Sequence, residues 1–147
     1  MNNGVLFNKN NYPIVKMDVF TINTDLEYEK FKKDWLDLYN LNKEFEFEIE
    51  TKNIRSINIK YMLSVPFFIN ELKKKNPQYL KCSKFYVYSP YMLYIIKTIF
   101  KLQSPIAPVY IIYNYDENFN NIKYTGFSKF FLNFIGNYEN KTYIIYP

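Results

Sequence analysis

The sequence predicts an α/β fold: a single domain with a mostly parallel sheet and helices mainly on one face. Three strand-like segments, at 44–50, 84–88 and 109–113, alternate with helix-like segments at 59–75 and 90–102. A repeated strand–helix unit implies parallel strands joined by right-handed crossovers. At 147 residues, the chain is long enough for one domain with a substantial hydrophobic core.

The segment 44–50 predicts that the helices lie on one side of the sheet. Its glutamates alternate with Phe45, Phe47 and Ile49, so one face of the strand is charged and the other is apolar. Parallel strands covered on both faces are almost continuously apolar, and this one is not. The second face is then solvent-exposed, covered by the terminal segments, or an interaction surface. The residues expected on it are Glu46, Glu48, Tyr86 and Tyr88.

The element order divides the chain into a central core and two flanking segments. Residues 1–13 form an N-terminal edge segment, and residues 14–113 form the α/β core. Residues 114–147 form a C-terminal loop, a short helix at 127–135 and a last strand at 142–146, all packing on the core.

The first helix has a clear start signal. A short edge strand at 5–7 and a longer strand at 14–22 come before it. Thr24 then has the side chain of an N-cap, and Glu27, three residues later, completes a capping box. We expect this helix to run to about Asn40.

Two prolines mark the later helices. Pro66 lies inside the predicted helix 59–75, so either the helix kinks there or Ser64 is a cap and Pro66 lies in the first turn. A kink or an irregular first turn is the interpretation we favour. Ser89 followed by Pro90 predicts a cap and first helical position for the helix at 90–102.

Composition and charge are both skewed. Phe, Tyr, Ile, Lys and Asn dominate the chain, which indicates an A/T-rich genome, such as that of a large DNA virus, an insect endosymbiont or certain protists. Residues 1–50 carry six lysines against ten acidic residues, and residues 51–147 carry thirteen basic residues against four acidic ones. The chain is therefore polarised, and it could attract partners of either sign, including copies of itself.

Catalytic and metal-binding motifs are absent from the sequence. The chain has no His, so its only cysteine, Cys82, lacks the usual base that would activate it as a nucleophile. The acidic run at 116–121 lacks the Gly and Glu that a calcium loop needs. We therefore predict a non-enzymatic protein without cofactor or metal. No secretory signal or membrane span is apparent, so we expect a cytoplasmic location, in the host cytoplasm or in a virion if the source is viral.

Residues 54–63 place Asn58, Ile59 and Lys60 between an apolar segment and a helix. This run, together with the element order over about residues 14–113, resembles the STAS domain of bacterial anti-sigma-factor antagonists and sulfate transporters. In that family the loop holds Asp-Ser-Ser/Thr-Gly, and one hydroxyl is phosphorylated in the antagonists. Asn58 stands at the Asp position, and Ile59 and Lys60 stand at the hydroxyl positions. The resemblance implies that the scaffold is kept and the phosphorylation switch is lost.

The patterns favour a non-catalytic module that binds another protein or itself in an assembly. Sixteen tyrosines supply contact area of the kind that is enriched at interfaces. The alternative is nucleic-acid binding through the basic, aromatic-rich region after residue 73, because lysines and aromatic rings together can hold a single strand. The expected interaction surface comprises Glu46, Glu48, Tyr86, Tyr88, Lys73, Lys74 and Lys75.

Overall fold

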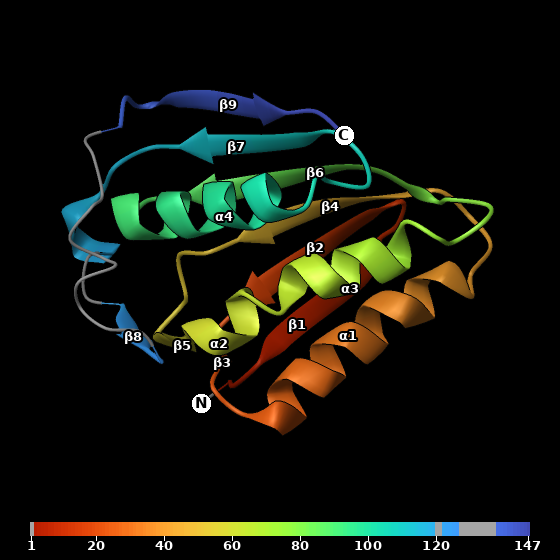
Figure 1. Cartoon of the computed structure of the whole chain (residues 1–147), viewed down its shortest axis with the longest axis horizontal. Helices are drawn as coiled ribbons and strands as arrows, with labels where there is room; N and C mark the ends of the chain where they lie inside the picture. The colour runs from red at the N-terminus through yellow and green to blue at the C-terminus, as the bar shows by residue number, and fades with distance from the viewer. Residues whose placement is uncertain (1, 120–121, 127–137) are drawn as a thin grey trace.

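The computed structural model describes residues 2–119, 122–126 and 138–147. It confirms the α/β class, with a six-stranded sheet and helices on one face (Figure 1). The strands of this sheet are β1 (Val5–Asn11), β2 (Ile14–Val19), β4 (Phe45–Glu50), β6 (Leu80–Val87), β7 (Val109–Tyr113) and β9 (Lys141–Ile145). Their order is β1-β2-β4-β6-β7-β9. The four inner strands are parallel, and β1 and β9 run antiparallel to their neighbours.

A second, three-stranded parallel sheet lies beside the ends of the first, and it was not predicted. It consists of β3 (Thr21–Ile22), β5 (Ser56–Asn58) and β8 (Lys123–Thr125). The predicted strand at 14–22 is therefore two strands, because Phe20 separates β2 from β3. β1 also continues to Asn11, four residues beyond the edge strand expected at 5–7.

The helices are α1 (Asp25–Tyr39), α2 (Ile59–Met62), α3 (Val65–Leu72) and α4 (Pro90–Leu102), and Glu117–Phe119 forms one 3-10 turn. The predicted helix at 59–75 is thus interrupted at Leu63 and Ser64. Pro66 lies in the first turn of α3, as the alternative with a new helix start near Ser64 predicted. The Ser64 hydroxyl does not cap α3 and instead donates to the Lys60 carbonyl (2.9 Å). The helix predicted at 127–135 falls outside the described residues.

The start of α1 confirms the predicted N-cap. The Glu27 backbone N–H donates to the Thr24 hydroxyl (3.1 Å), which satisfies one of the free donors of the first turn. The capping box is incomplete, because the Glu27 carboxylate does not accept a hydrogen bond from the Thr24 backbone N–H. It accepts from the Asn23 N–H (3.3 Å) and from the Thr21 hydroxyl, so it ties α1 to β3.

The hydrophobic core lies between the sheet and the helices. Phe47 on β4 is completely buried, and its ring meets that of Trp35 on α1 edge-on at 5.0 Å. Trp35 also contacts Phe31 (5.7 Å) and Phe68 (5.4 Å), so α1, α3 and β4 share one aromatic cluster. Burial of this cluster stabilises the one-sided arrangement, because each helix covers apolar residues of the strands beneath it.

Candidate functional site

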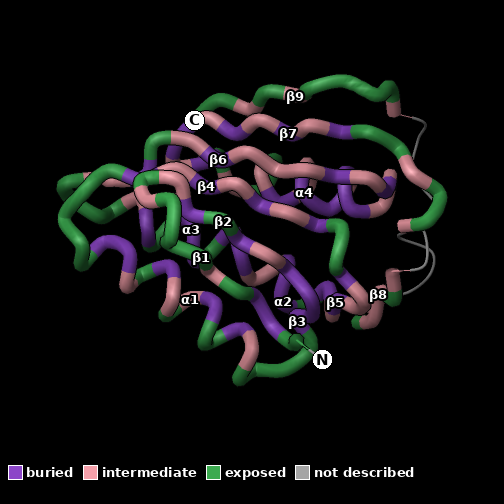
Figure 2. The backbone as a smooth tube through the Cα atoms, turned by 180° about the vertical axis from the view of Figure 1, so that it is seen from behind, coloured by how far each residue is buried: buried purple, intermediate pink, exposed green. Residues whose placement is uncertain are grey.

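None of the described residues covers the face of the large sheet opposite the helices, and we call it the open face. Every described strand residue that points to it is half-buried or exposed, whereas its sequence neighbours toward the helices are mostly buried. Figure 2 shows this side, where the strands lie in front of the helices. The described terminal strands β1 and β9 lie at the two edges of the sheet, so they do not cover it. The open face comprises Leu6, Asn8, Ile14, Lys16, Asp18, Glu46, Glu48, Glu50, Cys82, Lys84, Tyr86, Tyr110, Ile112, Thr142 and Ile144.

Charges of opposite sign alternate across the middle of the open face. Glu48 on β4 is in register with Lys16 on β2 and with Lys84 on β6. Opposite charges on neighbouring strands of one face attract each other, and this attraction favours the pairing of β2, β4 and β6. The row continues to Tyr110 on β7 and Ile144 on β9, where it becomes apolar.

The next row across the sheet brings two carboxylates together. Asp18 and Glu50 are in register on neighbouring strands. The loop after β4 supplies donors to both, because Asn53 Nδ2 donates to Asp18 Oδ1 (3.1 Å) and the Lys52 N–H donates to Glu50 Oε1 (3.0 Å). These bonds offset part of the like-charge repulsion.

A polar hollow of about 340 Å³ opens at this end of the open face. Its charged lining consists of three carboxylates and two ammonium groups, with the Tyr86 ring beside them. Within the described ranges, no group of three His, Cys, Asp or Glu side chains is arranged to hold a metal ion. The hollow therefore offers hydrogen-bond acceptors and an aromatic wall to a polar or basic side chain of a partner. Its lining residues are Lys16, Met17, Asp18, Glu48, Glu50, Lys52 and Tyr86.

Tyr86 and Tyr88, the two tyrosines predicted for this face, make different contacts. The Thr51 hydroxyl donates to the Tyr86 carbonyl (2.6 Å), which fixes the end of β6 and leaves the Tyr86 ring on the open face. Tyr88 lies just beyond β6, and its ring contacts Phe119 at 4.9 Å. Burial, followed by the Glu50 carboxylate, raises the pKa of Tyr88 to about 12. Tyr88 is therefore a neutral phenol at physiological pH.

Cys82 also lies on the open face, and the sequence did not single it out for this surface. Burial raises the pKa of the Cys82 thiol, and the nearby Glu46 carboxylate raises it further. A raised pKa keeps more of the group in its thiol form at neutral pH and so slows its alkylation. As the single cysteine of the sequence, Cys82 can serve as a chemical reporter on this surface.

The lysines predicted for the interaction surface lie elsewhere. Lys73, Lys74 and Lys75 follow α3, and the Lys73 ammonium donates to the Ser104 hydroxyl (2.5 Å). They precede β6, whereas Tyr86 and Tyr88 lie at its far end. The six strand residues 80–85 lie between the start of β6 and Tyr86, which corresponds to roughly 20 Å of extended chain. The structure therefore does not bring the basic run and the tyrosines together.

The loop that resembles the STAS switch in sequence order, at Asn58, Ile59 and Lys60, leads into α2. Asn58 is the N-cap, and its Oδ1 accepts from the Lys60 N–H (3.1 Å). Ile59 is 1% exposed, and the Lys60 ammonium lies 4.9 Å from the centre of the Tyr61 ring. A Cβ on Gly126, the residue that follows β8, would lie 2.1 Å from Asn58 Oδ1, so the backbone approaches this cap as closely as a glycine allows. These positions carry out capping and packing.

Comparisons with known proteins found no relative of this chain. No family model matches the chain, and neither a curated protein nor a solved structure matches it. Among the described residues, no helix has both the length and the apolar character that crossing a membrane requires.

Proposed function

We propose that this protein is a non-catalytic interaction or assembly module, built on a STAS-like scaffold without the phosphorylation switch, and that the open face binds a protein partner. The observation that carries the proposal is the open face of the large sheet, which the described residues leave uncovered and where charged and apolar side chains lie in rows across the strands. Ile59 and Lys60 offer no hydroxyl at the switch positions, which supports binding without phosphorylation control.

The two halves of the open face suit different parts of an interface. The β2 and β4 half is charged and contains the polar hollow. The β7 and β9 half presents Tyr110, Ile112 and Ile144, and Tyr146 follows it with 68% of its surface exposed. Protein interfaces combine an apolar, aromatic centre with a polar rim. A partner seated on the β7–β9 half would have the charged half as its rim.

The two edge strands of the sheet also favour the β7–β9 half as the contact surface. On β1, a register irregularity between Asn8 and Asn11 and the nearby Lys9 discourage pairing with another strand. β9 has no irregularity in its ladder with β7, and its exposed Ile144 continues the apolar row. The first partner to test is therefore a second copy of the chain at the β7–β9 half.

The proposal is tested by light scattering on the purified protein over a range of concentrations. Wild type is expected to form a complex heavier than the 17.9 kDa monomer. Ile144→Lys places a charge on the open face and is expected to shift the mass toward the monomer. Leu26→Lys makes the same change on α1, where Leu26 is 80% exposed, and should leave the mass unchanged. Wild type that stays monomeric and also retains no protein from a cell extract would refute the proposal.

The same samples test the alternative, nucleic-acid binding after residue 73. Phosphate contacts release counterions, so binding to single strands that falls steeply with salt would favour the alternative. Lys74→Ala with Lys75→Ala should then weaken binding, because both side chains are exposed. Unchanged binding to nucleic acid in this variant would place the contact elsewhere.

A further inference from the structure

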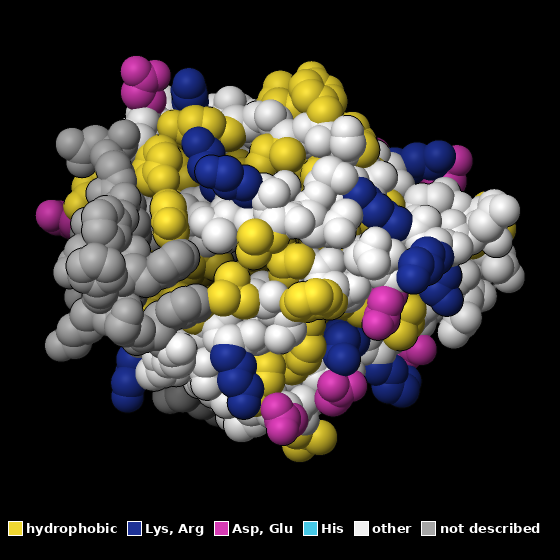
Figure 3. All heavy atoms as spheres, viewed as in Figure 1, with side chains coloured by type: hydrophobic (Ala, Val, Ile, Leu, Met, Phe, Trp, Pro, Cys, Tyr) yellow, Lys and Arg dark blue, Asp and Glu magenta, His cyan; other side chains and the backbone are white. Residues whose placement is uncertain are grey.

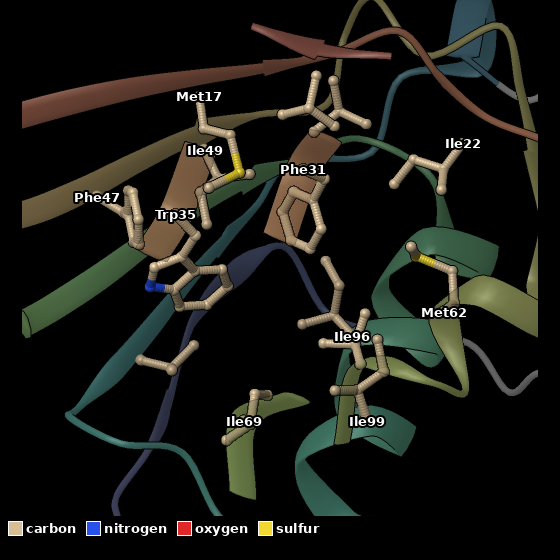
Figure 4. Close-up of a cluster of buried hydrophobic side chains, with 14 of the residues drawn as sticks. Met17, Ile22, Phe31, Trp35, Phe47, Ile49, Met62, Ile69, Ile96 and Ile99 are labelled. Atoms are coloured by element: carbon tan, nitrogen blue, oxygen red, sulfur yellow. The ribbon is translucent and has the colours of Figure 1, made fainter. Parts of the chain in front are cut away.

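A partly open cavity of about 110 Å³ lies among core side chains, on the helix side of the sheet. Its floor is formed by Met17 and Ile49 from the central strands. Ile69 on α3 and Ile96 on α4 lie across from them, and Phe31 on α1 forms a side wall (Figure 4). Protein interiors are normally packed so closely that few voids exceed the size of a water molecule. This cavity is several times larger than the space that one probe-sized water needs.

The lining is almost entirely apolar, which disfavours water and charged ligands. All lining residues are hydrophobic except Thr51 and Ser83. The Thr51 hydroxyl is already used, because it donates to the Tyr86 carbonyl (2.6 Å). A buried water needs two to four polar partners, so an apolar cavity of this kind stays dry. A charged group would lose its hydration without a paired charge in return.

The walls indicate the shape of the group that fits. Phe31 and Trp35 form one side, with their rings 5.7 Å apart and nearly perpendicular. Aromatic rings attract a further ring in edge-to-face or offset geometry at centroid separations of about 4.5–7 Å. An engineered cavity of about 150 Å³ with a Leu, Ile and Phe lining binds benzene. We propose that this cavity is a binding site for a small, uncharged hydrophobic molecule of about one aromatic ring.

The position of the cavity suggests how a ligand enters. Hydrophobic atoms reach the surface over and between α3 and α4 on the helix side (Figure 3). Phe100 and Ile106 are the lining residues on the α4 side that are only half-buried. Entry is therefore expected between α3 and the segment from α4 to Ile106. This site lies on the opposite side of the sheet from the open face, so it is independent of the proposed function.

The test titrates the purified protein with benzene and records the melting temperature and methyl NMR shifts. At about ten times Kd, binding should raise the melting temperature by about 3–5 °C. The largest shifts are expected for Met62, Ile96 and Ile99, which line the cavity. Ala107→Leu adds three carbons to a lining position and should abolish the response. Phe67→Ala changes an α3 residue that is 75% exposed and should leave it intact.

Each outcome decides the proposal. A saturable response in wild type and in Phe67→Ala, with loss in Ala107→Leu, supports it. No saturable shift in wild type, or an equal response in Ala107→Leu, overturns it. If Ala107→Leu does not fold, the wild-type methyl map is sufficient: shifts centred on Met62, Ile96 and Ile99 support the cavity, and shifts spread over the surface overturn it.

Discussion

Phe47 and Glu48 are neighbours in the chain that point to opposite faces of the sheet. Phe47 is completely buried and contacts three aromatic rings, at 5.0 Å (Trp35), 5.3 Å (Phe45) and 6.0 Å (Phe7). Glu48 lies on the open face and is half-buried. If the sheet is covered on one face only, truncation of these two residues to alanine should have very different effects on stability.

The expected magnitudes follow from burial. Phe47→Ala removes a buried ring and leaves a cavity that the surrounding residues fill only in part, which costs about 3–5 kcal/mol. Glu48→Ala removes a side chain from an uncovered surface. It loses favourable cross-strand pairing with Lys16 and Lys84, so we expect a cost within about 1 kcal/mol.

Urea unfolding measures both free energies. The chain has a single tryptophan, Trp35, whose ring contacts Phe47, so its fluorescence follows this part of the core directly. Circular dichroism on the same samples checks that the whole fold unfolds with it. A Glu48→Ala cost equal to that of Phe47→Ala would refute the reasoning, because it would mean that both faces of the sheet are covered.

Three further predictions test local features. Gly126→Ala should destabilise the protein by more than about 1 kcal/mol in urea unfolding, because Gly126 has φ +87° and a Cβ there would overlap Asn58 Oδ1; equal stability would contradict the contact. Five tyrosines have a pKa raised to about 12, chiefly by burial or, for Tyr61, by donation to Asp25, against 10.0 when unperturbed. Below pH 10 these tyrosines are neutral in both the folded and the unfolded chain, so folding stability does not depend on their titration. As the pH rises from 10 toward 12, they ionise first in the unfolded chain, which favours unfolding, so the urea midpoint should fall over that interval. A midpoint that stays constant between pH 10 and 12 would contradict this prediction. Glu46→Gln removes a carboxylate that raises the pKa of Cys82, so the pH midpoint of Cys82 alkylation should move down, and an upward shift would show that Glu46 does not act on the thiol. The five tyrosines are Tyr28, Tyr39, Tyr61, Tyr88 and Tyr124.

The one-sided sheet could be predicted from the sequence because its evidence is local. The alternation of glutamate with Phe45, Phe47 and Ile49 depends only on the period of a strand, and the structure has that pattern. The cap at Thr24 is equally local, since the donor lies three residues away. Tyr86 was placed on the open face for the same reason.

The remaining differences come from contacts between distant segments. β3, β5 and β8 are only two or three residues long, and each is defined by pairing with a segment far away in the chain. No periodicity can be read from such short pieces. The lysines after α3 were grouped with Tyr86 because they share a region of the sequence, but β6 carries the chain away from them. The core cavity depends on how α1, α3 and α4 meet, which no sequence pattern records.

The rate at which Cys82 is alkylated tests the proposed contact surface most directly. Cys82 is the only cysteine, and it lies half-buried on the open face, so one reagent reports on this surface without any mutation. If the open face binds a second copy or another protein, the rate should fall when the complex forms, and Ile144→Lys should restore it. A complex that forms while the alkylation rate of Cys82 stays unchanged would contradict the assignment of the open face as the contact surface.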